Sequence, residues 1–399
     1  MRDFVAREIK PLALHSSRLQ DFQRPFPLEL IDKAARIGLR TLALSEEAGG
    51  AGADHLTCCI VMEELAAGDA DVAATLAQTA ELGHVLFDQM MTPMQRERFL
   101  PRFVAEDRYH LAAALGDGDG ELAWSYHRPR GKSGGEMSAV RHGDEWVVSG
   151  AAPFVANAPV AELFAVAGKT DPASAGSSVL LVPRGTAGLT ISDPGGMAEE
   201  AGSRSVVKWF HGTAGKLVLK DCRVPVDNLL EGECSLTCDG AYLHGGMLNA
   251  AAINLGVGRA AYEGAVEYTR LRKQGGRQIV EHQAIGTILA DMAIKLEAAR
   301  NMVWKAAWAS DHPDAYADHS LPHLPLHTMA KIFVSEAVHE VTKSAAECFG
   351  AMGVMLDMPL PKYVHDALVF IHAGVSNSVA KFRVAEAVAD YRRLQAEKA

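Results

Sequence analysis

The chain has 399 residues, of which 48% are hydrophobic and 22% charged, and its formal net charge is -10. This balance is typical of a globular protein and excludes a disordered or fibrous one. Because single hydrophobic cores stop growing at about 250–300 residues, the length predicts two or three packed units. An acidic protein is repelled by nucleic acid and by anionic lipid, so neither is expected as a partner.

The sequence shows no sign of export or of membrane insertion. Charged residues run through the first ten positions, which therefore lack the apolar core of a signal peptide. No stretch approaches the roughly 20 apolar residues that cross a bilayer. Six sparse cysteines suit a reducing compartment, so a cytoplasmic protein with free thiols is expected. They are Cys58, Cys59, Cys222, Cys234, Cys238 and Cys348.

Residues 1–108 are predicted to form a helical domain. Their apolar residues recur at helical spacing, and Pro27 stands where the first turn of a helix tolerates proline. A glycine-rich stretch at 47–52 interrupts the pattern. The predicted helices cover residues 27–35, 54–67, 72–90 and 93–104.

Residues 109–226 change to short runs of strand type. These runs lie at 145–149, 162–167, 178–182 and 216–219, and turn signals such as His142-Gly143-Asp144 separate them. Parallel strands need a long crossover, and no helical pattern here is long enough to supply one. The sequence therefore predicts a compact antiparallel β domain.

Helical spacing returns in residues 227–399. One apolar stripe runs from Ile285 to Val303, and similar stripes cover 328–348 and 379–394. Long amphipathic helices joined by short links predict an antiparallel four-helix bundle. The expected fold is therefore of the α+β class, with an N-terminal helical domain, a middle antiparallel β domain and a C-terminal four-helix bundle.

Several local sequences, in order and spacing, resemble the acyl-CoA dehydrogenases. The run RKQGGR at 272–277 is followed by EHQAI at 281–285, and KDCRVP at 220–225 resembles the exit from that family's β domain. FGAMG at 349–353 and HDA at 365–367 are similar to two later landmarks. The resemblance spans nearly the whole chain and implies the acyl-CoA dehydrogenase fold with bound FAD.

The resemblance also implies which residues hold the FAD. Phe154 offers an aromatic face to the flavin ring, and Arg272 binds the pyrophosphate of a neighbouring subunit through its planar guanidinium. Two subunits then share each site, so a homodimer or homotetramer is expected. Glu347 departs from the family's usual glutamine and would repel phosphate. The full expected set is Phe154, Val155, Ala156, Arg272, Gln283, Glu347, Gly350, Ala351, Ser376 and Asn377.

The catalytic base of the family is missing from both of its usual positions. The reaction removes a proton beside the thioester carbonyl, which needs a base within hydrogen-bond reach. The resemblance puts that glutamate at position 374, or in some members at 246, and glycine stands at both. His244 is nearby and is assigned to the substrate site. Two residues along a helix rotate a side chain by about 200°, so a structural role is favoured over a catalytic one.

The expected function is an FAD-dependent oxidoreductase acting on an acyl-CoA thioester, with an electron-transfer flavoprotein as acceptor. Two alternatives remain open: the same fold and flavin with elimination, desulfination or oxygen-dependent hydroxylation, or a non-catalytic binding subunit. An acidic loop at 115–121, where the family often has a Thr-Glu-Pro stretch, would repel CoA phosphates and favours altered chemistry. No metal site is expected, because Pro322 and Pro325 interrupt the helix that His319, His323 and His327 would need.

Overall fold

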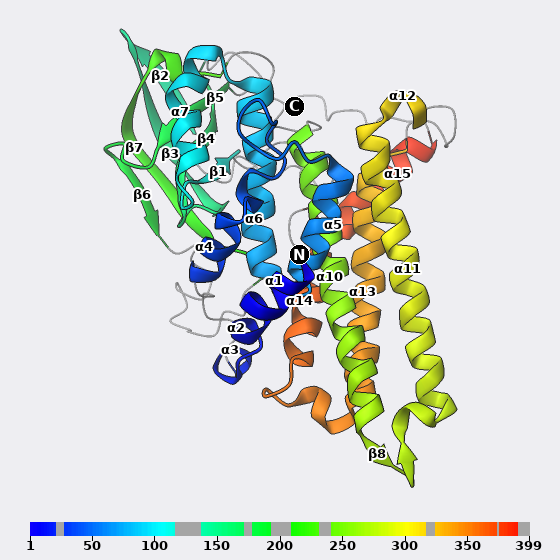
Figure 1. Ribbon diagram of the computed structural model, residues 1–399. Coiled ribbons are helices and arrows are strands. Elements are labelled where there is room, and N and C mark those ends of the chain that lie inside the picture. Colours follow the sequence, from blue (N-terminus) through cyan, green and yellow to red (C-terminus); the bar gives the residue numbers. More distant parts are fainter. Residues whose placement is uncertain are drawn as a thin grey trace, which may run out of the picture.

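The computed structural model describes residues 1–20, 28–115, 137–170, 178–192, 209–230, 241–316, 324–372 and 375–389. Figure 1 shows three regions in chain order, first short helices, then a β region, then a bundle of long helices. The α+β fold class predicted from the sequence is confirmed. Within the described ranges, no helix combines the length and apolarity that crossing a membrane requires.

The N-terminal helices begin where the sequence supplies capping groups. The side chain of Asp54 accepts a hydrogen bond from the backbone N–H of Thr57, and Asp69 accepts from those of Asp71 and Val72. Thr92 and Gln95 form a capping box. The helices are α1 (Arg2–Phe4), α2 (Lys10–Ala13), α3 (Ser16–Gln20), α4 (Leu28–Arg36), α5 (His55–Ala66), α6 (Ala70–Gly83) and α7 (Pro93–Ala105), with π-helical turns at Val5–Ile9 and His84–Met90.

The β region consists of two sheets that pack on each other. One sheet has the strand order β1-β4-β5 and the other β2-β3-β7-β6. Phe164 and Val166 of the first sheet share a core with Leu217 and Leu219 of the second. The strands are β1 (His110–Ala114), β2 (Ser138–His142), β3 (Glu145–Ala156), β4 (Ala161–Gly168), β5 (Ser178–Pro183), β6 (Leu189–Ser192) and β7 (Ala214–Pro225).

One strand pair differs from the antiparallel arrangement inferred from the sequence. β1 and β4 run parallel, with Ala112 opposite Phe164 and Ala114 opposite Val166. The expectation assumed that a parallel pair requires a helical crossover. Here the chain passes through β2 and β3 of the other sheet before returning as β4, so a second sheet supplies the connection. The other strand pairs within the two sheets are antiparallel.

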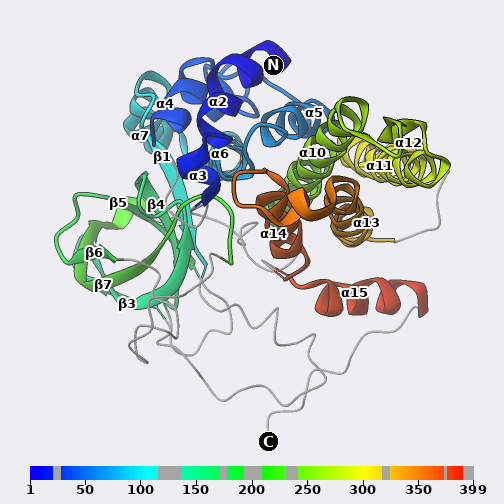
Figure 2. The same cartoon turned by 90° about the horizontal axis from the view of Figure 1, so that it is seen from below.

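The C-terminal bundle is built from α10 (Ala241–Leu271), α11 (Gln283–Asp311), α13 (Leu326–Phe349) and α14 (Leu360–His372). A small hairpin of β8 (Lys273–Gln274) and β9 (Arg277–Gln278) joins α10 to α11, α12 (Pro313–Tyr316) follows α11, and α15 (Asn377–Ala389) packs on α13. Figure 2 shows the bundle on the opposite side of α6 from the β region. Most of the apolar stripe predicted on α11 is buried, namely Leu289, Met292, Leu296, Ala299 and Val303.

A small residue permits a close contact between the backbones of α5, an N-terminal helix, and α10 of the bundle. A Cβ added to Gly256 of α10 would lie 2.4 Å from the carbonyl oxygen of Glu63 and 2.8 Å from the Cβ of Ala66, both on α5. The two helix backbones can approach this closely because residue 256 has no side chain. Gly264, two turns further along α10, has no atom within 4 Å of the corresponding position.

These two glycines form a matched pair for a stability test. We expect Gly256→Ala to lower the free energy of unfolding by about 1–3 kcal/mol, because overpacking displaces α5. Gly264→Ala is expected to raise it by up to about 1 kcal/mol, since alanine favours the helix and meets no neighbour. Urea denaturation followed by circular dichroism measures both. Equal effects at the two positions would contradict the close helix contact.

Candidate active site

A β-bulge near the end of β3 presents an aromatic side chain at the surface of the β region. Ala152 pairs with Leu217 and Val155 pairs with Gly215, so two residues of β3 lie opposite one residue of β7. The residues in the bulge are Pro153 and Phe154, and such a bulge re-aims a side chain. The Phe154 ring lies 4.8 Å from that of Trp209 and 5.3 Å from that of Phe210.

The end of β3 is anchored to helix α6. Asn157 has a left-handed backbone with φ of 64° and is buried. Its Nδ2 donates to the carbonyl oxygen of Thr75 at 2.8 Å and to Oγ1 of Thr79 at 3.2 Å. Its backbone N–H donates to the carbonyl oxygen of Thr213. The aromatic cluster is therefore held in a defined position relative to α6.

Buried charged residues connect α6 to the segment that follows this cluster. Nη2 of Arg18 donates to Oδ2 of Asp71 at 2.9 Å, and both side chains are buried. Nδ1 of His211 lies 3.4 Å from Oδ1 of Asp71, and the backbone N–H of Gly212 donates to the same oxygen. On its other side, Nε2 of His211 lies 3.0 Å from the carbonyl oxygen of Asp366 in α14. One imidazole thus bridges the β region and the bundle.

Lys362 of α14 completes this network. Its Nζ lies 2.5 Å from Oδ2 of Asp366 and 3.5 Å from Oδ2 of Asp69, the residue that caps α6. Burial disfavours the ammonium, but the neighbouring aspartates outweigh it and the pKa of Lys362 lies above its usual value. Burial also disfavours the carboxylate of Asp366, yet Lys362 lowers the pKa of Asp366 to about 2. Lys362 and Asp366 are therefore both charged at neutral pH.

A second lysine holds the chain that follows position 374. Lys331 of α13 is buried, and its Nζ donates to the carbonyl oxygen of Val375 and to Oδ1 of Asn377, each at 2.8 Å. Desolvation lowers the pKa of Lys331 to about 8. Asn377 also donates to Oγ of Ser335 and is buried. Ser376, by contrast, caps α15 through a long hydrogen bond from the N–H of Val379.

The other expected FAD residues lie at the far end of the bundle. Arg272 and Gln283 flank the β8–β9 hairpin, and Glu347, Gly350 and Ala351 lie where α13 ends; all five are exposed. Lys331, which touches Asn377, and Glu347 are sixteen residues apart on α13, about 24 Å at the rise of an α-helix. One chain therefore does not bring the two groups of residues together. This separation is what a site shared between subunits requires.

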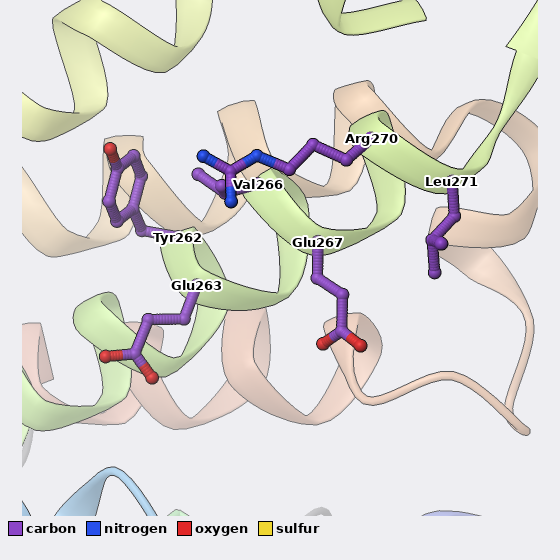
Figure 3. Close-up of a pocket in the computed structure, with 6 residues that line it drawn as sticks. All are labelled: Tyr262, Glu263, Val266, Glu267, Arg270 and Leu271. Carbon is purple, nitrogen blue, oxygen red and sulfur yellow. The ribbon is translucent and has the colours of Figure 1, made fainter. Parts of the chain in front are cut away.

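A surface pocket runs along α10 toward this far end. Figure 3 shows that its labelled residues come from one stretch of that helix. The lining residues are Tyr262, Glu263, Val266, Glu267, Arg270 and Leu271. It is remote from the aromatic cluster and from Asn377, and it ends one residue before Arg272.

The structure describes only one of the two glycines that stand where the resemblance puts the catalytic glutamate. Gly374 lies outside the described residues. Gly246 lies in α10, is exposed, and a Cβ there would have no atom within 4 Å. His244 lies in the first turn of α10, but its side chain, like the loop at 116–121, falls outside the described part of the chain.

Sequence reasoning missed a carboxylate that lies against Gly245, the residue before Gly246. Glu81 of α6 is 5% exposed, and its side chain occupies the place that a Cβ on Gly245 would take. It also missed the network around Asp71 and Lys362. A usable signal was present in α6, where the acidic residues Asp71 and Glu81 lie in a largely apolar helix that is buried along most of its length.

Comparison with known proteins identifies the family. A model of the N-terminal acyl-CoA dehydrogenase domain matches residues 1–107, and one of the C-terminal domain matches 240–389. The mitochondrial short-chain specific acyl-CoA dehydrogenase of Bos taurus is 31% identical over 382 residues, which are 94% of this chain and 85% of the relative. The chain belongs to the acyl-CoA dehydrogenase family.

Solved structures agree with this assignment. Butyryl-CoA dehydrogenase from Megasphaera elsdenii superimposes with a TM-score of 0.81 at 27% identity, covering 97% of this chain and 96% of the other. A structure described as an electron transferring flavoprotein of Acidaminococcus fermentans gives a TM-score of 0.80 at 27% identity, covering 97% and 95%. The similarity therefore extends over the whole fold and is not confined to one region.

The buried network makes stability depend on Lys362. We expect Lys362→Met to lower the free energy of unfolding by about 3–5 kcal/mol, because it leaves Asp69 and Asp366 without their cation. Lys33→Met is the control, since Lys33 pairs with Glu8 in an exposed ion pair and its loss should cost at most about 1 kcal/mol. Urea denaturation at pH 7 compares them. Equal losses would show that the network contributes no more than a surface pair.

The same network predicts a loss of stability in acid. The pKa of Asp366 falls from 3.8 to about 2 on folding, so its charge stabilises the folded state at pH values above about 4. This contribution, about 2 kcal/mol, disappears as the pH falls from about 4 to about 2. In Asp366→Asn, the free energy of unfolding should depend less on pH over that interval. Urea titration at each pH measures it. An unchanged slope would contradict the lowered pKa.

Proposed function

We propose that this chain is an FAD-dependent oxidoreductase that acts on an acyl-CoA thioester. Membership of the acyl-CoA dehydrogenase family supports the reaction class. The observation that carries the proposal is the arrangement at the end of β3, where a bulge presents Phe154 and Asn157 fixes the strand on α6. An aromatic face held in place beside the bundle can receive the flat ring of a flavin.

The residues present fit FAD in two separate places. The Phe154 cluster offers apolar and aromatic surface for the isoalloxazine ring, and Trp209 is 48% exposed. Arg272 is exposed, and no ion pair of its guanidinium is found within the described ranges, so it is available to a phosphate. Gln283 begins α11 beside it, at a helix N-terminus that favours anions. When bound, FAD supplies the oxidising group.

These two places imply a shared site and hence an oligomer. Because they lie at opposite ends of the bundle, the Arg272 end of one chain serves the flavin held by the Phe154 end of another. We infer a homodimer or homotetramer in which Arg272, Gln283 and the 347–351 turn act across the interface. An electron-transfer flavoprotein is the proposed acceptor, supported by the family assignment and by the structural neighbour of that description.

An absorbance spectrum followed by anaerobic titration tests this function. Purified protein should show flavin bands, and butyryl-, octanoyl- or palmitoyl-CoA should bleach them as the flavin is reduced. Buffer with free CoA is the control, since it carries no acyl carbon to oxidise. Flavin that no thioester bleaches would contradict dehydrogenation and favour other flavin chemistry. Colourless protein that takes up no added FAD would exclude the cofactor.

Substitution of Phe154 tests where the flavin lies. We expect Phe154→Ala to weaken FAD binding by about 2–10-fold, from the loss of an aromatic contact of about 0.5–1.5 kcal/mol. Phe154→Trp should retain FAD, since it keeps an aromatic face in the bulge. Fluorescence titration of the apoprotein with FAD measures both. If alanine binds FAD as tightly as phenylalanine, the ring lies elsewhere.

A further inference from the structure

A buried carboxylate on α6 lies beside the place where α10 has no side chain. An ideal Cβ on Gly245 would lie 1.9 Å from Oε1 of Glu81 and 2.5 Å from Oε2. The carboxylate therefore rests directly against the backbone of α10, and any other residue at 245 would displace it. Its neighbour Gly246 is exposed and has open space in the direction of a side chain.

Glu81 is buried beside a neutral hydrogen-bond partner and forms no ion pair within the described ranges. Nδ2 of Asn249 donates to Oε2 at 3.3 Å, which is a long bond from a neutral partner. Within the described ranges, no lysine or arginine forms an ion pair with Glu81, whereas Glu63 on α5 pairs with both Arg259 and Arg300. A buried carboxylate that lacks a cation costs folding energy and is retained where it has a task.

We propose that Glu81, reaching α10 from α6, is the base that removes the proton next to the thioester carbonyl. This inference rests on the proposed function and supplies the base that both glycine positions lack. The carboxylate accepts the proton and becomes a carboxylic acid. The electron pair of the broken C–H bond moves into the thioester and forms an enolate.

Two neighbouring features support this role. Burial raises the pKa of Glu81, and the nearby His55 and His84 oppose that shift. A raised pKa makes a carboxylate a stronger base, as general base catalysis near neutral pH requires. Gly245 leaves space for the carboxylate, and Gly246, the next residue of α10, is exposed and has no atom within 4 Å of an ideal Cβ.

Proton removal can be measured without flavin reduction. The FAD-containing protein is incubated anaerobically in D2O with butyryl-, octanoyl- or palmitoyl-CoA, and deuterium uptake at the carbon next to the carbonyl is followed by mass spectrometry. We expect wild-type protein to catalyse exchange with at least one thioester and Glu81→Gln to slow it by about 100-fold or more. Exchange should rise with pH through a midpoint above the usual carboxyl range.

A second variant displaces the carboxylate without removing it. Gly245→Ala places a methyl group where Oε1 lies, so exchange should fall at least 10-fold although Glu81 is still present. Gly264→Ala, on an open part of the same helix, should exchange at the wild-type rate. Glu81→Gln should keep the thermal midpoint of the wild type, because the amide has no charge to bury.

The outcomes separate this inference from the proposed function. Exchange by Glu81→Gln at the wild-type rate, or absence of exchange by wild-type protein with every thioester, would overturn the role of Glu81. Absence of flavin bands would overturn the proposed function alone. If protein without flavin bands still exchanges deuterium, and Glu81→Gln slows that exchange, Glu81 would still be identified as the base.

Discussion

The arrangement of the three regions depends on one buried set of charges at the start of α6. Asp69 and Asp71 begin this helix, and their partners come from elsewhere in the chain: Arg18 from α3, Lys362 from α14 and His211 from the segment before β7. Separating a buried charge from its partner is strongly destabilising. Moving the bundle away from α6 would separate Asp69 from Lys362, and moving the β region away would break the contacts of His211 with Asp71 and Asp366, so these contacts fix how the regions sit together.

Helix α6 therefore contacts both the aromatic end of β3 and the start of α10 in the candidate site. One face carries Thr75 and Thr79, which hold Asn157 and with it the aromatic end of β3. Another face carries Glu81 against α10. A helix that is buried along both faces can place the proposed flavin-facing strand and the proposed base relative to each other with little freedom. Catalysis gains from such positioning, because misplacing a group by about 1 Å can cost about 100-fold in rate.

The absence of a glutamate at Gly246 does not leave this part of the molecule without a carboxylate. The proposed base approaches the same stretch of α10 from a neighbouring helix, and Gly245 makes room for it. Chemistry depends on where a group lies and not on which helix carries it. Lys331 of α13 holds Val375 and Asn377, so the segment after Gly374 is anchored independently of any side chain at 374.

Local patterns in the sequence determined the elements themselves. The continuous apolar run of β5, the apolar stripe of α11 and the capping residues Asp54 and Thr92 specify strand, helix and helix start from neighbours only a few residues away. The motif at 272–277 indicated the family, since several landmarks kept their order along the whole chain. The fold class followed from these features, and so did the proposal that β3 faces the flavin.

Tertiary structure alone decided the contacts between residues far apart in the sequence. The parallel pairing of β1 with β4 depends on a passage through a second sheet, which no local pattern records. The pairing of Asp71 with Arg18 and His211, and the packing of Glu81 on Gly245, join residues separated by 53 to 164 positions. Hydrogen bonds and packing act over a few ångströms in space, so the sequence shows the groups and only the fold shows which of them meet.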